Sequence, residues 1–208
     1  MGLMKLRKGK WFLIVFNLMY IIAFGAYYVS IKNYEFLWYV GVLVFFFMLI
    51  GLTLHKSKFD YLILWGLSLW GLMHMAGGGV RVGGGVLYAI KIIPLINSGE
   101  LVVLRFDQFV HFFGFGVSTL VAYHLLSPYL NAGANYKIIY PLLAAVGMGL
   151  GALNEIVEFT AVLSFPKTGV GGYYNTALDL VFNMLGAITA IFVIHARRKK
   201  EFYKHHSP

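Results

Sequence analysis

The sequence contains no cysteine and few charged residues, and both shortages narrow what the chain can be. Without cysteine, disulfide bridges and thiolate metal sites are excluded. Charged residues make up 12% of the 208 residues, whereas soluble domains carry roughly 25%. Hydrophobic residues make up 60%, and several apolar runs reach about 20 residues, the length at which a helix crosses a bilayer. These features exclude an ordinary soluble domain and indicate a polytopic membrane protein.

Acidic residues are especially scarce. The chain has 8 of them against 17 Lys and Arg, which gives a net charge of +9. The basic residues gather before the first apolar run, at positions 5–10, and after the last one, at positions 197–204. Basic residues beside membrane spans are topology signals and also favour anionic lipid headgroups. We therefore expect membrane lipids as partners and do not expect nucleic acid.

Six apolar runs predict an all-α, polytopic integral membrane protein that forms a single transmembrane domain over residues 1–208. The expected spans are 11–31, 35–54, 60–79, 106–126, 138–163 and 176–196. Each has about the length that crosses a ~30 Å hydrocarbon core at ~1.5 Å per residue. The long connection over 80–105 contains an apolar part, Val86 to Ile96, that is too short to span. A re-entrant element and a surface-lying element are the alternatives there.

The distribution of basic residues predicts the orientation of these spans. With both termini inside the cell, the inner segments hold twelve of the 17 Lys and Arg, and the outer segments hold five. Because Lys and Arg concentrate on the cytoplasmic side of membrane proteins, we predict a multi-pass protein of the cytoplasmic (inner) membrane with both termini in the cytoplasm.

Polar residues within the apolar runs are the candidate functional residues, because ionisable groups in membrane spans are costly and usually mark function. They are His74, Asp107, His111, Glu155, Glu158, Asp179 and Asn183. Under the predicted topology, four helices bring these residues within roughly 12 Å of the outer boundary. Three pairs among them have a spacing of three or four residues, so each pair shares one helix face.

Carboxylate and imidazole groups from facing helices are typical ligands of Zn²⁺, Mn²⁺ or Fe. A metal ion would also offset the repulsion among close carboxylates. We predict a divalent metal held by Asp107, His111, Glu155 and Asp179. The predicted catalytic residues are Glu158, as a base or as an outer partner of the metal ligands, and His74, as a proton shuttle or a further ligand. The predicted substrate-binding residues are Arg81, Arg105 and Asn183. A proton or ion relay requires the same residue types without metal.

Simpler structural roles are open for these residues. Asp107 is placed to cap the start of the fourth helix, and Asp179 follows Thr176 at close to a capping-box spacing. Asn183 is a candidate for interhelical hydrogen bonding, and both histidines are candidates for packing roles. Glu155 has the weakest structural explanation, because an acid in the middle of a span has no helix end to cap.

The stretch HMAGGGVRVGGG at 74–85 carries two glycine triplets around Arg81. It lacks the Lys-Ser/Thr ending and the strand context of a phosphate-binding P-loop. Glycine lets the backbone turn sharply and approach other groups closely. A turn or hinge is one interpretation, and our prediction is that the stretch forms the mouth of the site.

Four stretches carry a resemblance to known families: MHMAGGG, LRFDQFVHFFGFG, GALNEIVEF and YYNTALDLVFNMLGA. Together they resemble the YjdF-like family of uncharacterised bacterial inner-membrane proteins and the related VanZ-like proteins. The resemblance covers about 74–187, and the positions that match the VanZ-like pattern are Asp107, His111, Glu155, Asp179, Asn183 and Gly186. It implies a membrane protein of unassigned activity, with a link to glycopeptide-antibiotic resistance. A second Arg of the YjdF-like pattern, expected before His111, is absent here.

The residues predict a metal-dependent hydrolase or transferase that acts at the outer membrane face on a lipid or lipid-linked anionic substrate. One alternative is a proton- or ion-coupled transporter or binding protein. Another is a VanZ-like accessory membrane protein without catalysis. The polar groups lie at one membrane face and no inverted repeat is visible, and both features favour the enzyme over the transporter.

Overall fold

The computed structural model describes residues 8–99, 101–131, 133–166 and 168–206, so residues 5–7 of the basic N-terminal group lie outside the described part. Its internal contacts form two compact units, Met1–Tyr88 and Ala89–Pro208. Each unit is described on its own below. The single transmembrane domain stays a prediction.

Three helices and a small hairpin make up the N-terminal unit. The helices are α1 (Lys8–Ser30), α2 (Tyr34–Ser57) and α3 (Tyr61–Gly79). Side-chain caps start two of them: Asn33 accepts from the N–H of Phe36 before α2, and Asp60 accepts from the N–H of Ile63 before α3. A buried hydrogen bond from Asn17 to Ser68 joins α1 to α3.

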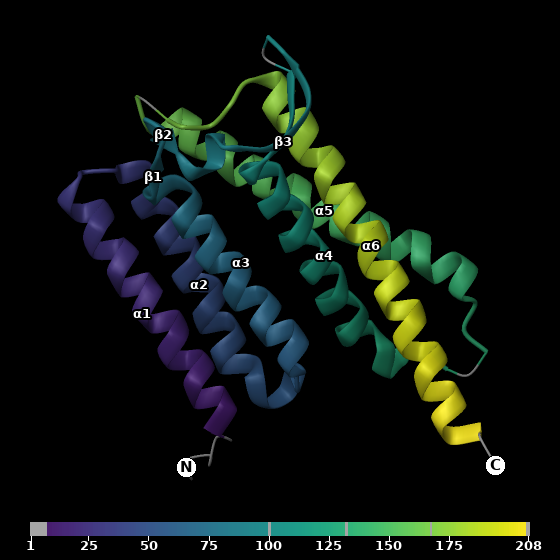
Figure 1. Cartoon of the computed structure of the whole chain (residues 1–208). Coiled ribbons are helices and arrows are strands. Elements are labelled where there is room, and N and C mark those ends of the chain that lie inside the picture. Colours follow the sequence, from purple (N-terminus) through teal and green to yellow (C-terminus); the bar gives the residue numbers. More distant parts are fainter. Residues whose placement is uncertain (1–7, 100, 132, 167, 207–208) are drawn as a thin grey trace. The chain divides into compact units, whose positions relative to one another are not determined.

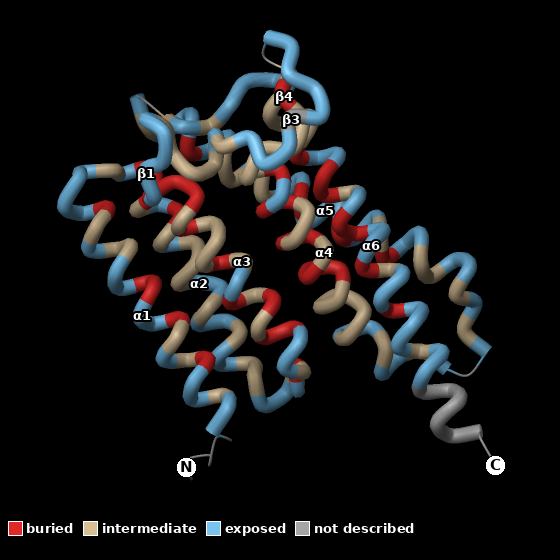
Figure 2. Tube along the Cα trace, viewed as in Figure 1, coloured by how far each residue is buried: buried red, intermediate tan, exposed pale blue. Residues whose placement is uncertain are grey.

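The C-terminal unit consists of a hairpin followed by three long helices. The elements are β3 (Lys91–Ser98), β4 (Leu101–Arg105), α4 (Phe106–Leu126), a 3₁₀ turn η2 (Ser127–Tyr129), α5 (Tyr136–Ser164) and α6 (Tyr173–His206). Helix α4 packs against both α5 and α6 (Figure 1). Buried residues run along α4 and α6 (Figure 2).

Glycines allow α4 and α6 to approach closely. A Cβ atom at Gly186 would collide with the backbone carbonyl of Phe112, and one at Gly116 would lie 3.1 Å from the carbonyl oxygen of Gly186. Small residues of this kind bring helix backbones together within membranes. The GFG and LGA segments therefore set the distance at which α4 and α6 present their polar residues to each other.

Residues 81–105 form two β-hairpins, so the prediction of an all-α chain was wrong for this connection. The first pairs β1 (Arg81–Val82) with β2 (Gly85–Val86) and is followed by a 3₁₀ turn, η1 (Leu87–Ala89). Its two-residue turn has positive φ values, +57° at Gly83 and +83° at Gly84, as the favoured hairpin turns require. The second hairpin pairs β3 with β4, and its register shifts between Lys91 and Ile96. That segment contains Pro94, which cannot donate a ladder hydrogen bond.

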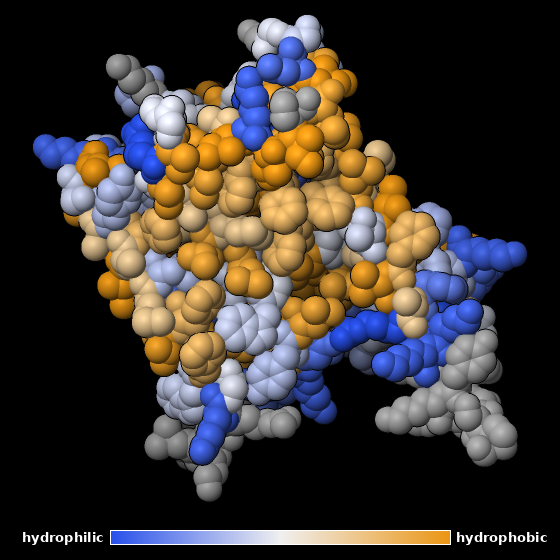
Figure 3. Space-filling model, in the orientation of Figure 1, coloured by the Kyte–Doolittle hydropathy of each residue, from blue (hydrophilic) through white to orange (hydrophobic). Residues whose placement is uncertain are grey.

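Helices occupy all six predicted spans, and in the described part of the chain five helices are long and apolar enough to cross a membrane. These five cover Lys8–Ser30, Tyr34–Ser57, Phe106–Tyr129, Tyr136–Ser164 and Tyr173–Lys200. The remaining helix, α3, has 19 residues and is rich in glycine. Hydrophobic side chains cover most of the helix surface in Figure 3, and hydrophilic ones gather near the helix ends. The described part of the chain thus has five to six apolar helices, and six membrane crossings with both termini in the cytoplasm stay a prediction.

Candidate functional site

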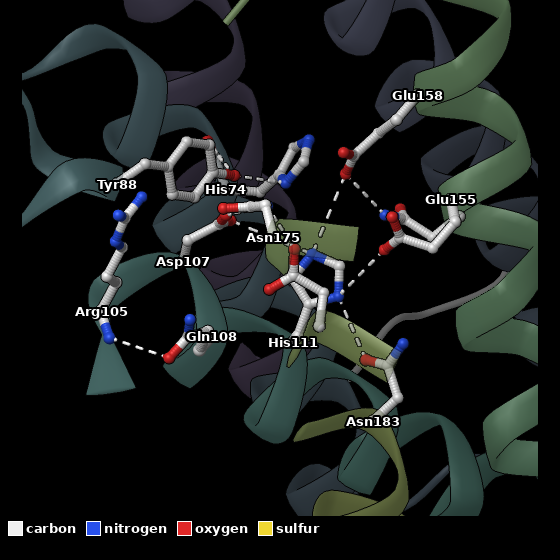
Figure 4. A network of polar contacts seen from close by, with 12 residues as sticks. His74, Tyr88, Arg105, Asp107, Gln108, His111, Glu155, Glu158, Asn175 and Asn183 are labelled. Atoms are coloured by element: carbon white, nitrogen blue, oxygen red, sulfur yellow. Dashed lines mark hydrogen bonds and ion pairs between the residues drawn. The ribbon is translucent and has the colours of Figure 1, made fainter. Parts of the chain in front are cut away.

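Three helices of the C-terminal unit bring six of the predicted residues together around His111 (Figure 4). Asp107 and His111 come from α4, Glu155 and Glu158 from α5, and Asp179 and Asn183 from α6. Within this group His111, Asp179 and Asn183 are buried, with at most 4% of their surface exposed. Pairs three or four residues apart on each helix therefore face one common interior point.

The two ring nitrogens of His111 face different partners. Nδ1 lies 3.1 Å from Oδ1 of Asn183 and 3.6 Å from Oε1 of Glu155. Nε2 lies 3.9 Å from Oδ1 of Asp107 and 3.9 Å from Oε1 of Glu158. The imidazole thus divides the cluster into an Nδ1 side with an amide and one carboxylate, and an Nε2 side with two carboxylates.

Two asparagines that were not predicted from the sequence hold these carboxylates in place. Asn175 donates to Asp107 Oδ2 at 3.2 Å and to Asp179 Oδ2 at 2.5 Å. Asn154 donates to Oε1 of Glu158 at 2.9 Å. Each asparagine stands four residues before the acid that it contacts on its own helix, so the i, i+4 spacing was the available signal.

Helix capping does not explain either aspartate, so both capping hypotheses were wrong. The cap of α4 is Arg105, and Gln108 completes it by accepting from the N–H groups of Leu104 and Arg105. Asp107 stands within the first turn. Helix α6 begins at Tyr173, so Asp179 lies well inside it. A glutamine three residues after the cap reaches back to the start of α4, as in a capping box, so Asp107 is not needed as its cap.

Several polar atoms in this region are buried without a hydrogen-bond partner among the described residues. They are Oε1 of Glu155, Oδ1 of Asp179, Nδ2 of Asn183 and Nε of Arg105. Leaving such a group unpaired costs about 1–3 kcal/mol. Two of these atoms are carboxylate oxygens beside an imidazole, which is the donor chemistry of a divalent cation site.

Two overlapping triads have the geometry to hold a cation. In each, one ligand atom per residue lies within 4.8 Å of the others: one triad is Asp107, His111 and Asp179, and the other is His111, Glu155 and Glu158. Donor atoms around a tetrahedral ion with bonds of about 2.0 Å lie roughly 3.3 Å apart. A modest closing of the side chains would therefore let either triad hold Zn²⁺, Mn²⁺ or Fe.

His74 and Arg81, which were also predicted as site residues, belong to the N-terminal unit. The hydroxyl of Tyr88 lies 2.6 Å from Nδ1 of His74 and donates to its carbonyl oxygen at 3.0 Å. Arg81 is exposed in β1. The first glycine triplet makes room for aromatic rings, since a Cβ at Gly77 would collide with Tyr88. The roles of His74 and Arg81 in the site, and of the stretch 74–85 as its mouth, stay predictions.

Two hollows lie in the C-terminal unit, and both are lined by Gly171 and Gly172. The first, of about 210 Å³, has Arg105, Gln108 and Asn175 among its walls. The second, of about 430 Å³, is a mainly apolar groove. Besides the two glycines, its lining is Glu155, Ile156, Glu158, Phe159, Val162, Val170, Tyr173 and Thr176. Carboxylates of the cluster thus reach the apolar groove, and Asn175 connects the cluster to the smaller cavity.

Comparisons with known proteins point to a membrane family without an assigned activity. The family described as "Predicted membrane protein (DUF2238)" matches residues 11–200. An uncharacterized protein of Thermotoga maritima is 26% identical over 102 residues, which cover 49% of this chain and 53% of that protein. The match therefore spans about half the length of this relative. No solved structure matches the chain.

Proposed function

The chain belongs to the family of predicted membrane proteins DUF2238, and we propose that it is a metal-dependent hydrolase or transferase whose metal site lies among α4, α5 and α6. The observation that carries this proposal is the convergence of four carboxylates on the buried His111. We further propose that the protein resides in the cytoplasmic membrane with both termini inside, which puts the cluster near the outer face.

The distances around His111 support a specific division of roles. We propose that the metal lies on the Nε2 side, where Asp107 and Glu158 face the ring, and that Asp179 completes the ligand set. Nδ1–H then donates to Asn183, an arrangement that commonly orients metal-bound histidines. The sequence interpretation assigned Glu155 to the metal and Glu158 to the base; the distances favour the reverse. Asn183 orients the His111 ring in this proposal, and this role replaces the substrate binding that the sequence predicted.

A metal held by His111, Asp107, Glu158 and Asp179 would supply the chemistry of hydrolysis: it would polarise an anionic ester and activate water. Glu155, on the Nδ1 side and at the edge of the apolar groove, is the proposed base that would take the proton from the attacking water. The same carboxyl group then returns the proton to the leaving group. Transfer to an alcohol in place of water follows the same steps.

An activity assay tests this function. The full-length protein, purified in a non-ionic detergent, is incubated with chromogenic phosphate monoesters, phosphate diesters and acyl esters, with Zn²⁺, Mn²⁺ or Fe²⁺ and with chelator. We expect metal-dependent turnover of at least one ester class that His111→Ala abolishes and Lys137→Gln preserves. Lys137 is the matched control because it is exposed at the opposite end of α5. Metal binding without turnover of any ester would contradict the enzyme proposal and favour ion binding or transport by the same residues.

A further inference from the structure

The two hollows beside the cluster have complementary chemistry. The smaller cavity is lined by Arg105, whose buried Nε has no hydrogen-bond partner among the described residues. A guanidinium group presents a planar fork of donors that matches phosphate oxygens. Asn175 lines the same cavity and donates to both Asp107 and Asp179. An anion bound by Arg105 therefore lies next to the proposed metal ligands.

The groove offers an apolar path that starts at the same cluster. Ile156, Phe159 and Val162 line it at intervals of three residues along α5, so they form one stripe. These side chains are 55%, 58% and 42% exposed. The groove also contains Glu155 and Glu158, so a hydrocarbon chain in it would end at the carboxylates. A stripe of this kind on a membrane-spanning helix faces hydrocarbon and not water.

We propose that the substrate is a lipid phosphate whose phosphate group binds Arg105 and whose hydrocarbon chain lies in the groove along α5. This assignment deepens the proposed function and rests on it for the reaction, which would take place at the ester bond between phosphate and chain. Phosphate suits the position because it has enough oxygens to bind Arg105 and a metal ion together. A bound metal would strengthen this binding, since four carboxylates beside Arg105 repel an anion.

Photo-crosslinking tests the assignment on the full-length protein in non-ionic detergent. The probe is dodecyl phosphate with a diazirine near the end of the chain, applied with Mn²⁺ and, separately, with chelator. We expect saturable crosslinks on α5 residues 156–162, mapped by mass spectrometry. Loss of a bidentate Arg–phosphate contact weakens binding by about tenfold or more. Arg105→Gln should lower labelling accordingly, Val162→Trp should block it by filling the groove, and Lys137→Gln should leave it unchanged.

Competition experiments separate the alternatives. Competition by unlabelled phosphatidic acid or by farnesyl phosphate supports the proposal, and the stronger competitor identifies a glycerolipid or an isoprenoid substrate. Equal competition by dodecanoate overturns the phosphate assignment. Labelling that spreads over α1 and α2 and ignores Arg105→Gln overturns the subsite altogether. Groove labelling that depends on Arg105 in a protein that takes up no metal would support the lipid site while contradicting the metal-dependent reaction.

Discussion

The side-chain oxygen of Asn183 lies 3.1 Å from Nδ1 of His111, and two carboxylates face the other nitrogen of the same ring. An amide oxygen only accepts, so the proton of the neutral ring belongs on Nδ1 in this contact. The lone pair of Nε2 then points toward Asp107 and Glu158. The hydrogen bond that His111 donates to Asn183 on α6 thus leaves Nε2 available for the proposed metal.

Replacing Asn183 tests whether its contact with His111 orients the ring for metal binding. Asn183→Ala removes the acceptor for Nδ1–H, and loss of such an outer-shell partner typically lowers metal affinity 10–100-fold. Asn183→Asp keeps an acceptor and should retain most of the affinity. Competition with a calibrated chelator measures the affinities. Equal metal affinity in wild type and Asn183→Ala would show that the ring is oriented by other contacts.

A second prediction concerns the packing of α4 against α6. Gly186→Ala forces a methyl group into the carbonyl of Phe112, and overpacking of this kind typically costs about 1–3 kcal/mol. Gly149→Ala is the matched control, because nothing lies within 4 Å of the added Cβ on α5. We expect a lower unfolding temperature for the first variant and no decrease for the second, measured by thermal unfolding in detergent. An undiminished stability of Gly186→Ala would contradict the close approach of the two helices.

Gln108 is predicted to hold the start of α4 and the second hairpin together. Its Oε1 accepts from the N–H groups of Leu104 and Arg105, and its Nε2 donates to the carbonyl oxygen of Val102. Leu104 has a φ of +70°, a conformation that costs a non-glycine residue of order 1–3 kcal/mol. Gln108→Ala should lower the free energy of unfolding by about 2–3 kcal/mol, because it leaves buried backbone groups unpaired.

Hydrogen exchange at the hairpin checks this role of Gln108 locally. Exchange at Leu104 and Arg105 should accelerate in Gln108→Ala and much less in Gln108→Glu, which keeps the accepting oxygen. If both variants exchange like the wild type, Gln108 does not secure this turn. The position of Arg105 in the wall of the smaller cavity depends on the same contact.

The helices were largely predictable from the sequence, because an apolar run long enough to cross a membrane has few alternatives to a helix. The expected span 106–126 coincides with α4, and the expected span 60–79 differs from α3 by one residue. The hairpins over 81–105 escaped prediction because their apolar residues form a short run without the strict alternation of a half-buried strand. Their turns depend on positive φ values at glycines such as Gly83. In the sequence, the same glycines were equally consistent with an unstructured hinge.

The polar cluster of α4, α5 and α6 was predictable from the spacing of acids along each helix, which shows the shared face. Spacing carries no information about which ring nitrogen faces which carboxylate, so the roles proposed for Glu155 and Glu158 rest on the distances in the structure. Asn175 and Asn154 were missed because neutral amides carry no charge that would mark them in a membrane span. Depth in the membrane suggested His74 as a partner, and that role stays a prediction.

Metal analysis of the purified protein tests the central claim most directly. Wild type, His111→Ala, Glu155→Gln and Glu158→Gln are purified without chelator, and bound Zn, Mn and Fe are measured by mass spectrometry. We predict stoichiometric metal in the wild type and in Glu155→Gln, and its loss in His111→Ala and Glu158→Gln. A wild-type protein that carries no metal and takes up none of the three ions would contradict the account.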